Sequence, residues 1–177
     1  MSPLTVEGRL PVLTLWEPWL TLMILGFKAT ETRHWYTKVR GPVALHAARK
    51  IVRDVDPELG ALCDFAIGPD WRAKDAIPLG CIRGVGFLGT CLSTRLLSGG
   101  WAPLLTPVAD CDRIAGNYDE GRWGFSFNHV RPLRDPLPLK SRQTPFWSWV
   151  APTDLEARLM PAVDQVEASR RWEARHG

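Results

Sequence analysis

The sequence predicts a small mixed α+β barrel flanked by helices. The chain has 177 residues, of which 45% are hydrophobic and 23% are charged, enough for one domain with a core. Short apolar runs rich in strand formers recur along it, separated by turns that draw on 15 glycines and 15 prolines. Few segments have helical spacing, and they do not alternate regularly with the strands. This order favours a mixed barrel over a βαβ fold.

The N-terminal third predicts a strand, a helix and two further strands. Residues 12–16 are an apolar run of strand formers, and a proline ends it. A buried two-turn helix is predicted over residues 18–25, with proline at its start and glycine just past its end. Loose alternation and turn residues predict strands over 29–36 and 43–47.

The middle of the chain predicts one helix and two strands. The helix begins at residues 54–57, and its apolar side chains recur at helical spacing to residue 66. A strand over 81–91 contains glycines, which mark a bend or a close backbone approach. A second strand covers 123–130. The remaining segments are a surface loop at 68–79, irregular chain at 98–121 and an extended proline-rich stretch at 132–149.

Three parts of the chain are predicted. Residues 1–10 have no periodicity and form a leader, residues 11–152 form the domain, and residues 153–177 form a C-terminal helical tail. In the tail, Thr153-x-x-Glu156 matches a capping box, and Pro161 breaks the helix or starts a second one.

Composition and motif searches exclude several classes of protein. The net charge of +3 is too small to indicate nucleic-acid binding by itself, but residues 28–53 hold seven bases and one acid. No apolar stretch is long enough to cross a bilayer, and the four cysteines lack zinc-site spacing. The sequence also lacks a phosphate-binding loop, a zinc-hydrolase motif and a serine-hydrolase elbow. We therefore expect reduced thiols, a cytoplasmic location, no membrane contact, no metal and no other cofactor.

Three motifs follow one another in the N-terminal third. They are Glu17-Pro18-Trp19, then Gly26-x-Lys28-x-x-Glu31-x-Arg33, then Arg40-Gly41 leading to His46-Ala47. Their order resembles that of the activating signal cointegrator homology (ASCH) domain, a branch of the PUA-like superfamily, over roughly residues 10–152. The resemblance implies a PUA-like β-barrel of five to six strands with a basic cleft beside the second motif. Relatives use this cleft for RNA or modified bases, and some are ribonucleases or acetylcytidine hydrolases.

The second motif supplies the central site candidates. If residues 29–36 form a strand, Glu31 and Arg33 lie on one face of it. There, the carboxylate can accept from a base amino group beside a guanidinium that faces phosphate, or the two can be an ion pair at the barrel mouth. The resemblance places Lys28 in the cleft, and a solvated lysine is the alternative. Lys28 and Glu31 are also the catalytic candidates if the chain is an enzyme.

Aromatic and basic residues supply the other ligand-binding candidates. Trp16 and Trp35 border polar residues and can stack on bases, whereas Trp19 is expected in the core. The resemblance places His46 at the cleft floor, and a satisfied structural histidine is the alternative. The last candidates are three bases for phosphate contact and a serine that points away from the core, namely Arg40, Arg49, Lys50 and Ser126.

Two positions depart from the family pattern. Glu17, a further ligand-binding candidate, stands where members commonly have glutamine, so an acceptor-only carboxylate replaces an amide. The acetylcytidine hydrolases resemble K-x-x-T, but here Glu31 takes the place of that threonine. Thr30 and Thr32 are each displaced by one residue, onto the other face of a strand. The family's hydrolase mechanism is therefore not expected in this form.

Three functions stay open. The first is binding of nucleic acid, RNA before DNA, with a single strand or a modified nucleoside in the cleft. The second is an enzyme at the same cleft, either a metal-independent ribonuclease or an amidohydrolase of a modified nucleoside. The third is a protein-interaction domain that uses the aromatic and proline-rich segments near Trp101 and residues 145–149.

Overall fold

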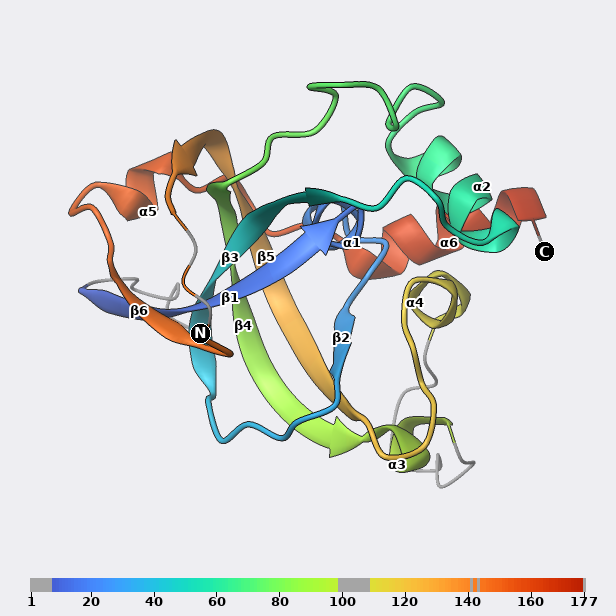
Figure 1. The fold of residues 1–177 in the computed structure, drawn as a ribbon, viewed down its shortest axis with the longest axis horizontal. Helices are drawn as coiled ribbons and strands as arrows, with labels where there is room; N and C mark the ends of the chain where they lie inside the picture. Colours follow the sequence, from blue (N-terminus) through green and yellow to red (C-terminus); the bar gives the residue numbers. More distant parts are fainter. Residues whose placement is uncertain (1–7, 99–108, 141, 143, 177) are drawn as a thin grey trace.

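A computed structural model describes residues 8–98, 109–140, 142 and 144–176 (Figure 1). These residues form six strands, namely β1 (Arg9–Glu17), β2 (Thr30–Arg33), β3 (Gly41–Ile51), β4 (Cys81–Ser93), β5 (Trp123–Pro138) and β6 (Trp147–Val150). They also form six helices, namely α1 (Trp19–Ile24), α2 (Pro57–Ala66), α3 (Thr94–Ser98), α4 (Asp110–Ile114), α5 (Leu155–Arg158) and α6 (Gln165–His176).

All six strands belong to one mixed sheet with the order β2-β5-β4-β3-β1-β6. β1 runs parallel to β3, and the other neighbouring pairs are antiparallel. The longest strands, β4 and β5, lie side by side, and irregularities interrupt their register at three places. Such irregularities bend and twist a sheet. The predicted α+β fold with a mixed sheet and a C-terminal helix is confirmed.

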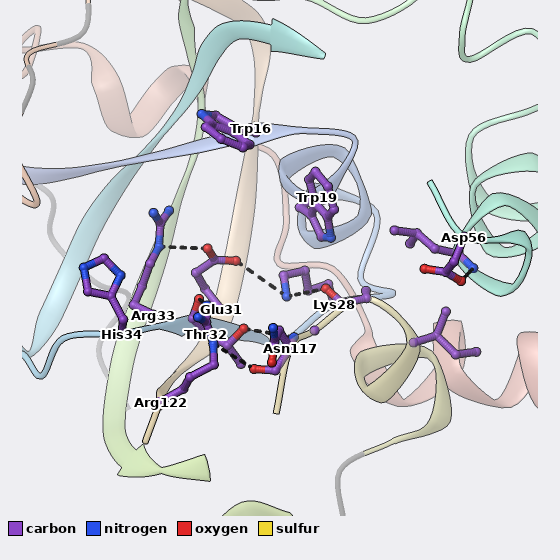
Figure 2. A pocket seen from close by; sticks show the side chains of 14 residues that line it. Trp16, Trp19, Lys28, Glu31, Thr32, Arg33, His34, Asp56, Asn117 and Arg122 are labelled. Carbon is purple, nitrogen blue, oxygen red and sulfur yellow. Dashed lines mark hydrogen bonds and ion pairs between the residues drawn. The ribbon is translucent and has the colours of Figure 1, made fainter. Parts of the chain in front are cut away.

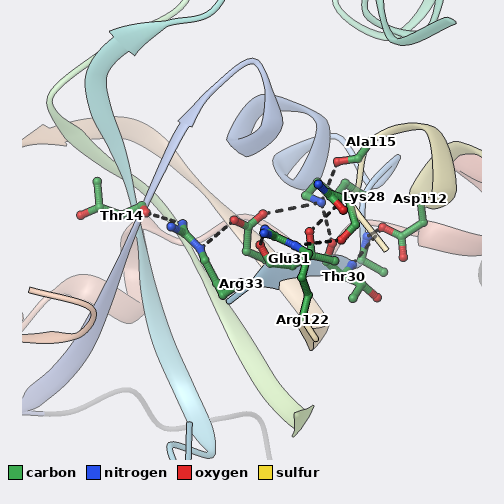
Figure 3. A network of polar contacts seen from close by, with 11 residues as sticks. Thr14, Lys28, Thr30, Glu31, Arg33, Asp112, Ala115 and Arg122 are labelled. Carbon is green, nitrogen blue, oxygen red and sulfur yellow. Dashed lines mark hydrogen bonds and ion pairs between the residues drawn. The ribbon is translucent and has the colours of Figure 1, made fainter. Parts of the chain in front are cut away.

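The sheet curls until strands near its opposite edges approach each other. β2 is one edge, and β1 lies next to the other edge. The Arg33 Nη2 of β2 nevertheless donates a 2.9 Å hydrogen bond to the Thr14 carbonyl of β1 (Figure 3). Within the described ranges no strand pairing joins the two edges, so closure into a barrel stays a prediction.

Glycines in β4 allow α1 and β5 to pack closely, as the sequence predicts. A Cβ on Gly84 would lie 2.7 Å from the Arg131 carbonyl oxygen in β5 and 2.9 Å from the Cδ1 of Ile24 in α1. No side chain fits in that space without a shift of its neighbours. The missing side chain lets α1 and β5 approach β4 closely at this position.

A second core lies beside the sheet, between α2, α4 and α6 (Figure 1). Leu59 of α2, Cys111 of α4 and Trp172 of α6 are buried there together with Phe27, which follows α1. The predicted C-terminal helical tail thus packs against the rest of the chain. As predicted, Pro161 lies between two helices, α5 and α6.

Some local predictions differ from the structure. The α4 helix lies within residues 98–121, which lack helical periodicity and were expected to be irregular. Asp154 is the N-cap of α5 and makes no side-chain capping bond, so the predicted Thr153 capping box is wrong. β1 begins at Arg9, and residues 1–7 of the expected leader lie outside the described residues. No helix in the described part of the chain is long and apolar enough to cross a membrane.

Candidate functional site

A cavity of about 340 Å³ opens between the β1–α1 turn, β2 and the chain that follows α4 (Figure 2). Two tryptophans, Trp16 and Trp19, line one side. The polar side is formed by β2 and by residues from the segment between α4 and β5. Its labelled side chains are Lys28, Glu31, Thr32, Arg33, His34, Asn117 and Arg122.

The two tryptophans differ in exposure and contacts. The Trp16 side chain at the end of β1 is 52% exposed, which is unusual for so large an apolar group. The ammonium of Lys50 lies 3.9 Å from the centroid of the Trp16 ring, a cation–π contact at the rim of the cavity. Trp19 packs in part against the second core, as expected, and also lines the cavity.

The short strand β2 separates its polar side chains onto two faces. Thr30 and Thr32 are buried, whereas Glu31 and Arg33 are half-buried and line the cavity. This alternation confirms that Glu31 and Arg33 share a face. Arg33 Nε lies 2.9 Å from Glu31 Oε1, but its hydrogen is not aligned with that oxygen, so the contact is an ion pair. Arg33 is fixed by its separate bond to Thr14.

Lys28 is buried, with 1% of its side chain exposed, and it is not a solvated lysine. Its ammonium donates to the carbonyl oxygens of Thr30, at 2.5 Å, and Ala115, at 3.0 Å. It also lies 3.6 Å from Glu31 Oε2 (Figure 3). Two of the three ammonium protons are thus used in hydrogen bonds, and the 3.6 Å contact with Glu31 is an ion pair. Lys28 therefore joins β2 to the end of α4 and flanks the Glu31 carboxylate on the side opposite Arg33.

Residues 112–122 complete the wall of the cavity, and sequence reasoning missed them. Asp112 Oδ1 accepts 3.0 Å hydrogen bonds from the backbone N–H groups of Ala29 and Thr30. The Asn117 N–H donates to the hydroxyl of Thr32, and the Arg122 guanidinium donates to the Thr32 carbonyl. These bonds hold the α4–β5 connection against β2. The segment has no periodic pattern that would predict this contact.

Several predicted site residues do not line this cavity. Glu17 is completely buried, accepts from Arg83 at 3.0 Å, and accepts from the Thr21 N–H at 2.9 Å. Burial raises the pKa of Glu17, and the positive charge of Arg83 opposes that shift in part. The carboxylate thus fixes the first turn of α1 to β4.

His46 and Trp35 are also held in structural contacts. The His46 ring is buried between the Thr14 hydroxyl and the Leu139 carbonyl, and it packs edge-on against Trp147. Burial lowers its pKa. Trp35 packs edge-on against the core ring of Phe125, with centroids 4.9 Å apart. The structure does not bring either side chain to the lining of the cavity.

The remaining basic candidates are separated along β3. Arg40 precedes the strand, whereas Arg49 and Lys50 lie near its end, nine and ten residues further along, or about 30 Å at 3.3 Å per residue. Of these three bases, Lys50 contacts Trp16, which lines the cavity. Ser126 lies opposite Thr30 across the β2–β5 ladder and faces a second cavity, of about 610 Å³.

The segments proposed for protein interaction are partly outside the described residues. Trp101 is among the residues that the structure does not describe. In the other segment, Trp147 is buried and Phe146 packs against the main core, so these rings are not free for a partner. Within the described ranges, no three His, Cys, Asp or Glu side chains are grouped so as to hold a metal ion.

The chain is similar to two curated relatives. It is 34% identical to human activating signal cointegrator 1 over 84 residues, and 34% identical to the mouse protein over 85 residues. Each match covers 47% of this chain and 14% of the relative, so the chain matches about one seventh of those proteins. No family model matches the chain.

Solved structures of an ASCH protein from Zymomonas mobilis are also similar. One is 13% identical with a TM-score of 0.45 and covers 87% of this chain and 97% of that chain. A single-residue variant of it is 14% identical with a TM-score of 0.42, and covers 93% of this chain and 94% of that chain. Because these scores are below 0.5, the family assignment depends on sequence. The cointegrator matches, together with the three ordered motifs of the N-terminal third, show that this chain is an ASCH-domain protein.

Proposed function

We propose that this chain binds nucleic acid, RNA before DNA, by taking one unpaired base into the cavity beside Glu31. One observation carries the proposal. An exposed indole, Trp16, stands at the rim of a cavity whose polar side presents a carboxylate held between two cations. Aromatic stacking with polar contacts to the base edge is how proteins recognise unpaired bases in RNA.

The size and charge of the cavity support a single base over a duplex. A volume of about 340 Å³ is at the small end of the range for ligand sites. The ammonium of Lys50 over the Trp16 ring adds a positive charge at the rim of the cavity, which can attract the phosphate next to a bound base. With a net charge of only +3, stacking and edge contacts must supply much of the affinity. In this proposal the curled sheet closes into the expected barrel, and that barrel supports the cavity.

The contacts of Lys28 favour binding over catalysis. A catalytic lysine needs a proton or a lone pair that is free to act on the substrate. The Lys28 ammonium is instead buried on two carbonyl oxygens and one carboxylate. The nearest hydroxyls belong to the buried side chains of Thr30 and Thr32, and the Thr32 hydroxyl already accepts from the Asn117 N–H. The ribonuclease and amidohydrolase alternatives therefore have less support than binding.

The proposal is tested by fluorescence anisotropy with a labelled single-stranded RNA and the matching DNA, each at two salt concentrations. Trp16→Ala should weaken RNA binding about tenfold, because stacking of a base is worth about 1–3 kcal/mol. Tyr36→Ala is the matched control, since Tyr36 is 47% exposed and does not line the cavity. Equal affinities for the two variants, or no RNA binding by the unchanged chain, would contradict the proposal.

A further inference from the structure

The Glu31 carboxylate retains accepting capacity that faces the cavity. A carboxylate offers about four lone-pair sites on its two oxygens. Arg33 engages Oε1, and Lys28 engages Oε2. No other described side chain is paired with this carboxylate, which is 13% exposed and lines the cavity. Both contacts are ion pairs and not hydrogen bonds, so accepting sites remain on each oxygen and the carboxylate can receive two N–H groups.

The neighbours of Glu31 give this edge of the cavity a direction. The guanidinium of Arg33 lies beside Oε1 and lines the same cavity (Figure 2). The guanidinium is a donor only, and the carboxylate is an acceptor only. Read from Arg33 across Glu31, the cavity presents a donor followed by two acceptors. A ligand that matches it presents an acceptor followed by two adjacent donors.

Among the four common bases, this order occurs on the Watson–Crick edge of guanine. Guanine has the O6 acceptor, the N1–H donor and the N2 amino donor next to one another. Adenine and cytosine each have one amino donor beside a ring nitrogen that accepts, and uracil has one N–H between two carbonyls. These three edges would each set an acceptor of the base against a Glu31 oxygen. An unpaired acceptor in such a site costs affinity.

We infer that the cavity selects guanine, with O6 toward Arg33 and with N1–H and the N2 amino group on the two oxygens of Glu31. The inference rests on the proposed function, because it names the base that the same site takes. In this arrangement Trp16 supplies stacking that any base can use, whereas Glu31 and Arg33 supply the choice of base. Lys28 is then a positioning residue, which holds Glu31 Oε2 in place.

The test is a titration of intrinsic tryptophan fluorescence with the monophosphates of guanosine, inosine, adenosine, cytidine and uridine. Guanosine monophosphate should bind about tenfold more tightly than the other three common nucleotides. Inosine monophosphate keeps O6 and N1–H but lacks the N2 amino group. A further ligand, 1-methylguanosine, lacks the N1–H and is compared with guanosine. Each should lose about tenfold against its guanosine counterpart. These analogues test the contacts in the unchanged chain, so the result does not depend on how a variant folds.

Variants then assign the selectivity to Glu31. Glu31→Gln should reduce the preference for guanosine monophosphate to less than about threefold, because an amide donates at one of the two positions. Glu120→Gln is the matched control, since its side chain is 83% exposed outside the cavity. Equal binding of all the nucleotides, or preference for another base, would overturn the guanine inference while the proposed function stands. Absence of any nucleotide or RNA binding would overturn both.

Discussion

Replacement of Lys28 by methionine tests whether this residue holds the site together or acts on a substrate. Methionine is similar in length and apolar, so it fills the buried space without the charge. The variant removes the donors to the Thr30 and Ala115 carbonyls and leaves Glu31 with Arg33 alone. Replacement of a lysine with a purely catalytic role would leave no buried acceptor unpaired.

The structure gives the size of the expected effect. Hydrogen bonds from a charged donor are worth about 1.5–3 kcal/mol each, and Lys28 makes two of them to buried carbonyls. The loss of one member of a buried ionic group typically costs about 3–5 kcal/mol. The apolar methionine side chain offsets part of this loss by its burial. We therefore expect Lys28→Met to lower the free energy of unfolding by about 3–5 kcal/mol.

Urea denaturation followed by circular dichroism measures this free energy, with Lys74→Met as the control for an exposed lysine. The control should unfold at the same midpoint as the unchanged chain, and Lys28→Met at a clearly lower one. A loss below about 1 kcal/mol for Lys28→Met would refute the role we assign to Lys28. It would return Lys28 to the catalytic candidates.

Further predictions concern pH, salt and thiol chemistry. Burial lowers the pKa of His46, so as the pH falls the unfolded chain takes up a proton before the folded chain does. The free energy of unfolding should therefore fall as the pH drops below about 6.5. In urea denaturation, His46→Gln should flatten this pH dependence. Lys50→Ala should weaken RNA binding and reduce its salt dependence, whereas Arg40→Ala, about 30 Å away along β3, should change neither in anisotropy titrations. Burial raises the pKa of the Cys63 thiol to about 12, so Ellman's reagent should modify Cys63 only in denaturant, and rapid labelling of Cys63 in the native protein would contradict its burial.

Local patterns predicted the elements that carry the site. The apolar run and its proline predicted α1, and two-residue spacing predicted that Glu31 and Arg33 share a face. These predictions succeed because backbone geometry within one element depends on neighbouring residues. The wall formed by residues 112–122 depends on contacts about 80 residues apart in the chain, such as Asp112 with Ala29. No period or composition in that segment indicates such a contact.

Sequence proximity was a poor guide to spatial proximity in the basic region. Arg40 and Arg49 are close in sequence, but an extended strand separates them. Glu17 is two residues from Trp19, yet its carboxylate is buried against Arg83 while the indole lines the cavity. The direction of each side chain depends on tertiary packing, which the three motifs do not specify.

The most direct test of the central claim is an NMR titration of the indole N–H signals with a short single-stranded RNA. The chain has nine tryptophans, whose indole signals can be assigned by single substitutions. Binding of a base in the cavity predicts large shifts for Trp16 and Trp19, while Trp147, buried in a separate core cluster, stays in place. Saturable RNA binding that leaves the Trp16 and Trp19 signals unmoved would contradict the account.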